Sequence, residues 1–366
     1  MTSFAELTTM RVGGSPTRLV EATTRAELVE AARDAWESGE PWLVLGGGSN
    51  LVVADDGFDG TVIRVASRGI DVAPDATDTG LAIVRVEAGE PWDALVAHTV
   101  QHGLAGIEAL SGIPGSTGAS PIQNIGAYGQ EVADSLVAVE FLDYLSGEVE
   151  RLSPAELGLD YRTSAIKQGR QGVVLSVEFA LHRSADGLSA PIAYDQLAGA
   201  LGVHLGDSVP LATVRETVLA LRASKGMVLD PADPDSVSSG SFFTNPLVGE
   251  NFARTLPDDA PRWLNEPEPV DAIVPLGEIP AAPPERTDYR VKLSAAWLIE
   301  RAGITKGFSL PGSGAAVSSK HTLAIVNRGG ATADEVAQLG RYIQTRVFSE
   351  FGVRLQAEPV LVGVSL

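Results

Sequence analysis

The chain has 366 residues, of which 44% are hydrophobic and 20% charged, and its formal net charge is −20 at pH 7. This composition is typical of a globular protein with two or three domains. The acidic balance argues against nucleic acid as a partner, because a phosphate backbone requires a basic surface. The chain contains no cysteine, which excludes disulfides and thiolate chemistry. Without a membrane-length apolar run or a signal-peptide pattern, we expect a cytoplasmic protein that does not enter a membrane.

The first predicted helix covers "TRAELVEAARDAWESG", from Thr24 to Gly39. Thr24 and Glu27 form a capping box. One face of this helix is apolar, and its members are Leu28, Ala31, Ala32, Ala35 and Trp36. The next stretch, "PWLVLGGGSNLVV", predicts a short buried strand, a glycine turn and a second strand. Taken alone, the triple glycine is most simply interpreted as a tight hairpin turn.

Strand and helix signals then alternate. The segments "IVRVEAG", "VAVEFLDY" and "GVVLSVEFAL" have the β-branched, alternating pattern of strands. A helix is predicted to start at "SPAEL", residues 153–157, where Ser153 and Glu156 form a capping box around Pro154. The sequence therefore predicts an α+β fold.

The C-terminal third contains two further predicted helices. They cover "KLSAAWLIERAG" (292–303) and "TADEVAQLGRYIQTRVFSEFG" (332–352), the second with a capping box of Thr332 and Glu335. Between Pro257 and Pro284 there are eight prolines, too many for a central strand or a helix interior. We expect this stretch to run extended over a surface.

Metal and common catalytic motifs are not found. His98 and His102 have the spacing of ligands on one helix face, but no H-E-x-x-H pattern accompanies them, so we predict no metal site. The triple glycine is not a dinucleotide fingerprint, since Leu51 stands where a glycine is needed, and no G-K-[ST] or G-x-S-x-G occurs.

Two glycine-rich loops carry the first functional signal. "LGGGSN" (45–50) follows a predicted strand, and "EALSGIPGSTGASPIQNIGAYGQE" (108–131) interleaves glycines with polar donors and anchoring isoleucines. Successive exposed N–H groups in such loops form anion sites. We predict that the two loops together hold an extended dinucleotide.

The chain also resembles a known family. "LGGGSNLVV", "SGIPGSTGASPIQNIGAYGQE", "YRTS", "GSFFTNP", "GAAVSSKHTLAIVN" and "AEPV" occur in the order seen in UDP-N-acetylenolpyruvoylglucosamine reductases. The resemblance implies a two-lobed FAD-binding region of the vanillyl-alcohol-oxidase type plus a C-terminal α+β substrate-binding domain. Mapped onto this chain, lobe one is 1–68 with the C-terminal return 351–366, lobe two is 69–224 and the substrate-binding domain is 225–350.

The resemblance also implies cofactors and their contacts. FAD is bound non-covalently, and NADPH is the hydride-donating co-substrate. The implied flavin-binding residues are Gly46, Gly47, Gly48, Ser49, Asn50, Leu51, Gly112, Ile113, Pro114, Gly115, Ser116, Gly118, Ser120, Ile122, Asn124 and Gly126.

Three residues are implied to be catalytic. Ser241, in "GSFFTNP", is the general acid that protonates the carbanion-like carbon of the enolpyruvyl substrate after hydride transfer. Arg162 grips the substrate carboxylate, and Glu358 polarises it. A carboxylate that faces another carboxylate is expected to raise the pKa of one of the two, so Glu358 is a candidate to carry a proton in the complex.

Substrate-binding residues follow from the same resemblance. Tyr194 lies in a loop that closes over the diphosphate in one subclass, Lys225 contacts the diphosphate or the nicotinamide, and Tyr161 and Asn245 contact the UDP-sugar. Thr244 departs from the family pattern, which has a lysine at that position. The implied partners are the UDP-sugar and NADPH, and no protein partner is implied.

The residues alone leave two other classes of function open. One is an FAD-dependent sugar or alcohol oxidase of the same flavin-binding fold, although no histidine or cysteine lies in either glycine-rich loop to bind flavin covalently. The other is a non-catalytic nucleotide-binding module, which leaves Ser241, Arg162 and Glu358 without a role.

Overall fold

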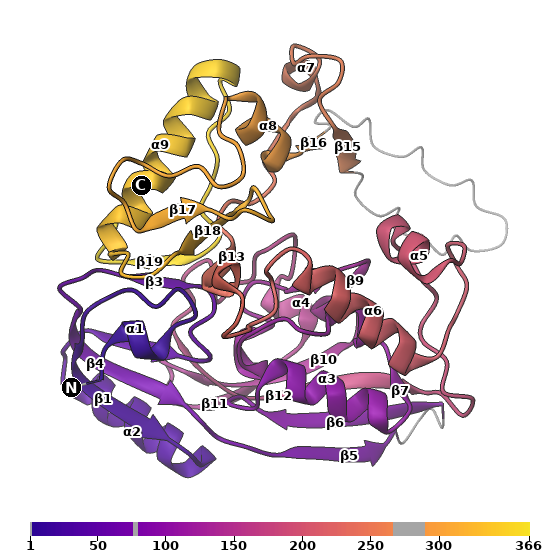
Figure 1. The fold of residues 1–366 in the computed structure, drawn as a ribbon. Coiled ribbons are helices and arrows are strands. Elements are labelled where there is room, and N and C mark those ends of the chain that lie inside the picture. Colours follow the sequence, from indigo (N-terminus) through magenta and orange to yellow (C-terminus); the bar gives the residue numbers. More distant parts are fainter. Residues whose placement is uncertain (1, 76–79, 266–289) are drawn as a thin grey trace, which may run out of the picture.

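The computed structural model describes residues 2–75, 80–265 and 290–366. Its N-terminal elements and a large antiparallel sheet form the lower part of the molecule in Figure 1, and the C-terminal elements form the upper part. This mixed architecture confirms the predicted α+β class.

The N-terminal elements form a small parallel sheet with the order β1-β4-β2. Its strands are β1 (Pro16–Ala22), β2 (Trp42–Leu45) and β4 (Phe58–Val65), and it is preceded by the one-turn helix α1 (Phe4–Leu7). Helix α2 (Arg25–Glu37) has Thr24 as its N-cap, with the capping box to Glu27 formed. The apolar face predicted for this helix is confirmed, because Leu28, Ala32 and Ala35 are buried.

The second sheet is antiparallel, with the order β11-β10-β12-β6-β5. Its strands are β5 (Ile70–Pro74), β6 (Leu81–Glu87), β10 (Leu136–Asp143), β11 (Val149–Leu152) and β12 (Gly172–Arg183), and β7 (Leu104–Ala105) pairs with β12. The helices of this region are α3 (Trp92–Gln101), α4 (Pro154–Leu157), α5 (Asp195–Leu201) and α6 (Leu211–Ala223). The strands predicted at 83–89, 137–144 and 172–181 correspond to β6, β10 and β12.

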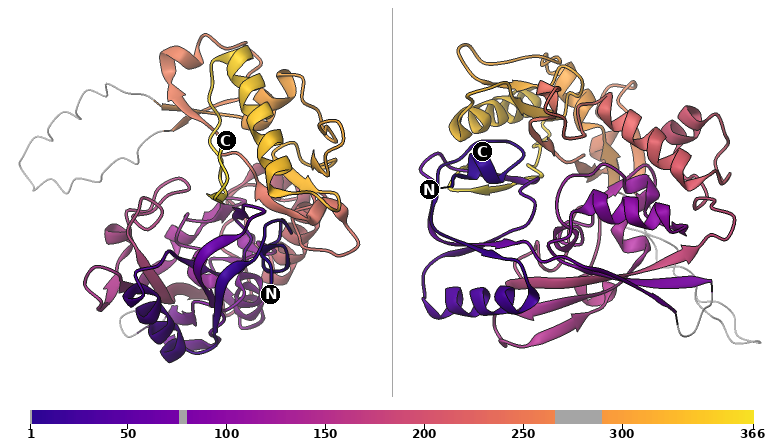
Figure 2. Two further views of the ribbon diagram at one scale, coloured as in Figure 1. Left: turned by 90° about the vertical axis from the view of Figure 1, so that its left-hand side faces the viewer. Right: turned by 60° about the horizontal axis from the view of Figure 1, so that its bottom comes forward.

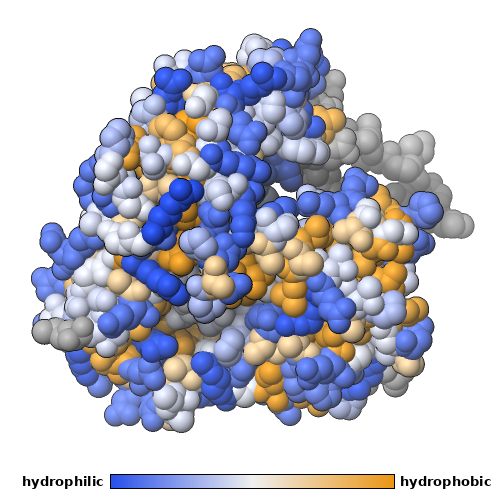
Figure 3. Space-filling view, in the orientation of Figure 1, coloured by the Kyte–Doolittle hydropathy of each residue, from blue (hydrophilic) through white to orange (hydrophobic). Residues whose placement is uncertain are grey.

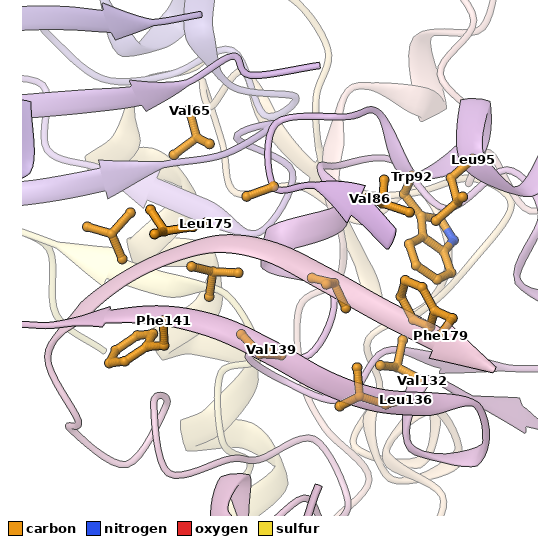
Figure 4. Packing of buried hydrophobic residues seen from close by; sticks show 14 of the residues in the cluster. Val65, Val86, Trp92, Leu95, Val132, Leu136, Val139, Phe141, Leu175 and Phe179 are labelled. Carbon is orange, nitrogen blue, oxygen red and sulfur yellow. The ribbon is translucent and has the colours of Figure 1, made fainter. Parts of the chain in front are cut away.

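The two N-terminal sheets share one hydrophobic cluster. It includes Leu28 of α2 and Ile63 of β4 together with side chains of the antiparallel sheet. Figure 4 shows part of this cluster, where Trp92 of α3 faces Phe179 of β12; their rings meet edge to face with centroids 5.9 Å apart. Burying such large side chains stabilises the fold by about 1.5–3 kcal/mol each relative to exposure.

The upper part contains two three-stranded sheets. One has the order β13-β18-β17 and consists of β13 (Ser238–Ser241), β17 (Ala315–Val317) and β18 (Ala324–Asn327). The other has the order β14-β16-β15 and consists of β14 (Leu247–Gly249), β15 (Arg262–Asn265) and β16 (Arg290–Leu293). The helices of the upper part are α7 (Glu250–Ala253), α8 (Ala295–Arg301) and α9 (Ala333–Phe351).

Two predictions for this part had different outcomes. Helix α9 begins after Thr332, whose capping box with Glu335 is formed, and ends at Gly352 in the left-handed conformation. The helix predicted from residue 292 was wrong at its start, since Lys292 and Leu293 belong to β16 and the helix begins at Ala295. Pairing with β14 and β15 on either side overrides the local helical pattern there.

The hairpin interpretation of the triple glycine is also wrong. β2 pairs with β4, whereas β3 (Leu51–Val53) pairs in parallel with β19 (Val360–Val362) near the end of the chain. Figure 1 shows β3 and β19 side by side at the boundary between the lower and upper parts. The views in Figure 2 show the same arrangement from the side and from below.

Several short elements complete the fold. β8 (Gly126–Ala127) and β9 (Gln130–Glu131) form a small hairpin, and 3-10 turns cover Glu108–Leu110, Thr117–Ala119, Val132–Asp134 and Pro234–Ser236. Of the proline-rich stretch, the described part ends with β15, an edge strand, and residues 266–284 lie outside the described residues.

Hydrophilic residues cover most of the face shown in Figure 3, with hydrophobic residues in scattered patches. Among the described residues, no helix combines the length and the apolar character that crossing a membrane requires.

Candidate active site

The first glycine loop joins β2 to β3 and presents a row of unused donors. Within the described residues, no backbone N–H from Gly46 to Asn50 donates to a protein acceptor. Gly48 has a φ of 61°, and its carbonyl accepts from the N–H of Thr9 at 3.0 Å. Leu51 is buried at the start of β3. Successive unpaired N–H groups are the donors that a diphosphate requires.

The two glycine-rich loops contact each other directly. A Cβ built on Gly47 would lie 2.6 Å from Cα of Gly115, and one on Gly46 would lie 2.3 Å from Oγ of Ser116. The Ser49 hydroxyl donates to the carbonyl of Pro114 at 2.9 Å. The nearest protein atoms to these glycines therefore belong to the opposite loop.

The second loop is anchored at its start by Asp93 of α3. The carboxylate of Asp93 accepts from the N–H of Gly112 at 2.6 Å and from two nitrogens of Arg215 at 2.7 and 2.8 Å. Burial alone would raise the pKa of Asp93, but these hydrogen bonds hold it below its usual value. Ile113 packs against the main hydrophobic cluster.

Further along, the predicted flavin-binding residues of this loop have structural contacts of their own. A Cβ on Gly118 would lie 2.5 Å from the Ala88 Cβ, and the Ser120 hydroxyl donates to the carbonyl of Thr117 at 2.7 Å. The Asn124 amide is buried and donates to Glu131 at 2.8 Å.

Carbonyls near the end of this loop accept hydrogen bonds from side chains of the segment 160–164. Ile122 accepts from the Ser164 hydroxyl at 2.5 Å, and Gly126 accepts from Arg162 at 2.7 Å. The first loop thus fits FAD through its free N–H groups and absent side chains, while several hydroxyl and amide side chains of the second loop hold that loop itself.

Ser241 lies at the end of β13, directly before two buried rings. Phe242 and Phe243 are 0% and 1% exposed, and their rings meet at 75° with centroids 5.2 Å apart. The Ser241 Oγ lies 3.5 Å from Nε2 of His321. The sequence did not mark His321 as a site residue, because it lies 80 residues further along the chain.

The environment of His321 keeps its ring neutral near pH 7. Burial, with smaller contributions from the cations Lys225, Lys306 and Arg222, lowers the pKa of His321 from 6.5 to about 4. The turn that carries it is fixed by Asp235, which accepts from the N–H and the hydroxyl of Ser319 at 2.9 and 2.5 Å.

Arg162 and Glu358 form an ion pair with 3.5 Å between Nε and Oε1. Nη1 and Nη2 of Arg162 donate to the carbonyls of Asn124 and Gly126 at 3.0 and 2.7 Å. Each of these nitrogens has two N–H groups, so one N–H on each is not used by these two carbonyls. The backbone N–H of Glu358 donates to the carbonyl of Phe242 at 3.0 Å, which places Glu358 opposite the residue that follows Ser241.

Burial raises the pKa of Glu358, and Arg162 and Lys167 partly offset this effect. Burial likewise lowers the pKa of Lys167, whose Nζ donates to Oε1 of Gln123 at 3.4 Å. The cause of the raised pKa of Glu358 is burial, whereas the expectation from the sequence concerns a facing substrate carboxylate and stays a prediction.

The predicted substrate contacts occupy two places. Tyr194 and Lys225 both contact Tyr128, with ring centroids 5.9 Å apart and the ammonium 5.6 Å from the ring, and Lys225 also donates to Gln196 at 2.9 Å. Tyr161 lies elsewhere, beside Asn245, whose side-chain oxygen accepts from the N–H of Ala295 at 2.9 Å.

A cation lies near the position where Thr244 departs from the family pattern. The Lys292 Nζ is 5.3 Å from the ring centroid of Tyr161, next to Asn245. Lys292 carries no functional signal in the sequence, because its segment has the pattern of a helix start, whereas the structure places it in β16. Lys167 and Gln123 were also missed, since their contacts come from segments far away in the chain.

Known proteins resemble this chain over its full length. Residues 16–153 match the FAD binding domain, and residues 231–362 match the C-terminal domain of UDP-N-acetylenolpyruvoylglucosamine reductase. The reductase of Leifsonia xyli subsp. xyli is 62% identical over 376 residues, covering 100% of this chain and 99% of that protein. That of Streptomyces coelicolor is 51% identical, covering 99% and 90%.

A solved structure agrees. The crystal structure of UDP-N-acetylenolpyruvylglucosamine reductase from Thermus caldophilus superposes with a TM-score of 0.63 at 26% identity, covering 99% of this chain and 97% of that one. The chain belongs to the UDP-N-acetylenolpyruvoylglucosamine reductase family.

Proposed function

We propose that this protein uses NADPH and FAD to reduce UDP-N-acetylglucosamine enolpyruvate to UDP-N-acetylmuramate. The observation that carries the proposal is the backbone hydrogen bond from Glu358 to Phe242, the residue after Ser241, because it joins the segment of a carboxyl with raised pKa to the segment of the serine. Family membership supports the same reaction.

Bound FAD supplies the hydride that reduces the enolpyruvyl double bond. The chain's own residues then stabilise and neutralise the negative charge that forms on the carbon next to the carboxylate. Arg162 binds that carboxylate through its free N–H groups, and Ser241 gives the proton from its hydroxyl. His321, neutral and 3.5 Å from Oγ, keeps the serine hydroxyl oriented.

We further propose a division of labour along the chain. Residues 1–68 with 351–366 and residues 69–224 form the two flavin-binding lobes, and residues 225–350 form the substrate-binding domain. Two tyrosines of the second lobe contribute to substrate binding, Tyr161 beside Asn245 and Tyr194 together with Lys225 at the Tyr128 ring. The product is a peptidoglycan precursor, so the activity serves cell wall biogenesis, and with it cell shape and division, in the cytoplasm, where UDP-sugars and NADPH are available.

The test separates the two half-reactions by stopped-flow absorbance of the flavin. Ser241→Ala should bind FAD and be reduced by NADPH at nearly the parent rate. Its reoxidation by the enolpyruvyl substrate should slow by at least about 100-fold, because general acid catalysis contributes about 10²- to 10⁴-fold. Ser241→Cys should recover part of this loss.

Ser239→Ala is the matched control, because Ser239 lies in the same strand and its buried hydroxyl has no hydrogen-bond partner in the described residues. It should reoxidise at the parent rate. Normal reoxidation in Ser241→Ala would remove the serine from the reaction, and equal slowing of both halves would indicate a displaced flavin instead.

A further inference from the structure

Three residues from distant segments close a hydrogen-bonded ring around the Glu358 side chain. The Asn50 Nδ2 donates to the backbone carbonyl of Glu358 at 3.3 Å and to Oε1 of Gln123 at 2.5 Å. The Gln123 Nε2 in turn donates to Oε1 of Glu358 at 3.5 Å. The ring links the first glycine loop, the second glycine loop and the segment before β19.

The ring fixes the orientation of both amides. A backbone carbonyl only accepts hydrogen bonds, so the Asn50 side chain must turn its NH₂ group toward Glu358 and Gln123. Gln123 must then present its oxygen to Asn50, which leaves its NH₂ group facing the Glu358 carboxyl. Glu358 thus specifies, through its own backbone, the donor that contacts its side chain.

Lys167 enforces the same orientation independently. Its ammonium has donors only, and Nζ lies 3.4 Å from Oε1 of Gln123. A flipped Gln123 would place its NH₂ group against both the Asn50 amide and this ammonium, with no acceptor between them. Two separate donors therefore hold Gln123 with its NH₂ group toward Glu358.

We propose that Gln123 is a positioning residue for Glu358: its NH₂ group donates to Oε1 and fixes the orientation of the carboxyl, so that Oε2 remains available to the substrate. Within the described residues, Arg162 and Gln123 both contact Oε1. Because both contacts come from donors and reach Oε1, any proton that the carboxyl carries resides on Oε2. This inference rests on the proposed function, in which Glu358 acts on the substrate carboxylate.

The effect of a substitution at Gln123 on the pKa of Glu358 depends on the charged and titratable groups around that carboxyl. They are Arg162, Lys167 and Tyr161. Gln123→Glu keeps the shape and the acceptor for Asn50 and Lys167, but it faces Glu358 with a second carboxylate. Like charges at this separation disfavour ionisation, so the pKa of Glu358 should rise. Gln123→Met removes the donor without adding charge, and the pKa should rise less.

The experiment measures the carboxyl of Glu358 directly by infrared titration of the FAD-loaded enzyme. The Glu358 band is assigned by its loss in Glu358→Gln. We expect its titration to move to higher pH in the order parent, Gln123→Met, Gln123→Glu. Reoxidation by the enolpyruvyl substrate should also slow by about 10- to 100-fold in Gln123→Met at neutral pH, the effect of losing a hydrogen bond to a charged group, while reduction by NADPH stays close to the parent rate.

Gln168→Met is the matched control, because Gln168 lies next to Lys167 and its side chain donates to Thr163 away from Glu358. It should leave the Glu358 band and both rates at parent values. Flavin absorbance and circular dichroism verify that each variant is folded, and if Gln123→Glu does not fold, the Gln123→Met shift decides the matter.

The outcomes distinguish this inference from the proposed function. An unchanged Glu358 band in both Gln123 variants overturns the positioning role, even if Glu358→Gln reoxidises slowly. Conversely, a shifted band together with normal reoxidation in Glu358→Gln supports the positioning of Glu358 and refutes its role in the reaction.

Discussion

Arg162 shows how single residues here combine strain with function. Its φ of 53° lies in the left-handed region, which costs a non-glycine residue on the order of 1 kcal/mol. Hydrogen bonds from its guanidinium to the carbonyls of Asn124 and Gly126, and its ion pair with Glu358, offset that cost. The conformation directs the cation to the point where the second glycine loop meets Glu358.

The buried ring of His321 predicts a specific pH dependence of stability. Its pKa is about 4 in the folded protein and near 6.5 when unfolded, so the unfolded chain binds more protons between these values. Stability should therefore fall as the pH is lowered through this window, by at most about 3 kcal/mol from this residue. In His321→Gln that part of the loss should disappear, as measured by urea unfolding at several pH values.

His204→Gln provides the comparison for this measurement, because the His204 side chain is 97% exposed. It should keep the pH dependence of the parent. If His321→Gln also keeps it, the acid sensitivity of the protein resides in other groups.

At the scale of elements, the flavin-binding region depends on two loops that interlock. The first loop follows β2 of the parallel sheet, and the second follows β7, which pairs with β12 of the antiparallel sheet. The two loops meet where Gly47 faces Gly115. Neither loop has room for a side chain at this contact. Their separation from each other is therefore set by the absence of Cβ atoms.

Gly47→Val should push the loops apart and reduce flavin retention. The added Cβ would lie 2.6 Å from a backbone atom of Gly115, a contact that the backbone must move to relieve. We expect the purified variant to have clearly less bound flavin by absorbance than the parent. Gly249→Val, where a Cβ meets nothing within 4 Å, should retain its flavin fully. Full flavin content in Gly47→Val would show that the loops can separate without loss of the site.

The sequence predicted elements well where the signal was local. The capping boxes at Thr24, Ser153 and Thr332 all mark real helix starts. It failed where distant pairing decided the outcome: β3 has its partner about 300 residues away, and Lys292 joins a strand because β14 and β15 flank it. Gln123 and His321 were missed for the same reason, since their partners come from other segments.

At the scale of the whole molecule, the last strand joins the upper and lower parts. Leu361 of β19 packs against the cluster that contains Phe242 and Phe243, and Val362 packs against the cluster of the first glycine loop's flanking strands. Two successive residues of β19 thus pack against two different hydrophobic clusters. Glu358 lies just before this strand.

Val362→Ser should destabilise the protein by about 1 kcal/mol, because it removes apolar contacts with the cluster that contains Leu51 and Val53. Val360→Ser, on the same strand but 49% exposed, should stay within about 0.5 kcal/mol of the parent. Chemical unfolding of both variants makes the comparison. Equal losses at the two positions would mean that β19 contributes through its backbone pairing alone.

The pairing of β3 with β19 also bears on how the protein is made. Synthesis proceeds at about 5–20 residues per second, so the ribosome needs on the order of 15 to 60 s to travel from β3 to β19. For most of that interval, once residue 131 has been added, the nascent chain contains both glycine-rich loops but neither β19 nor Glu358. The hydrogen bonds of Asn50 and Gln123 to Glu358 can therefore form only after the ribosome has added a residue 308 positions beyond Asn50.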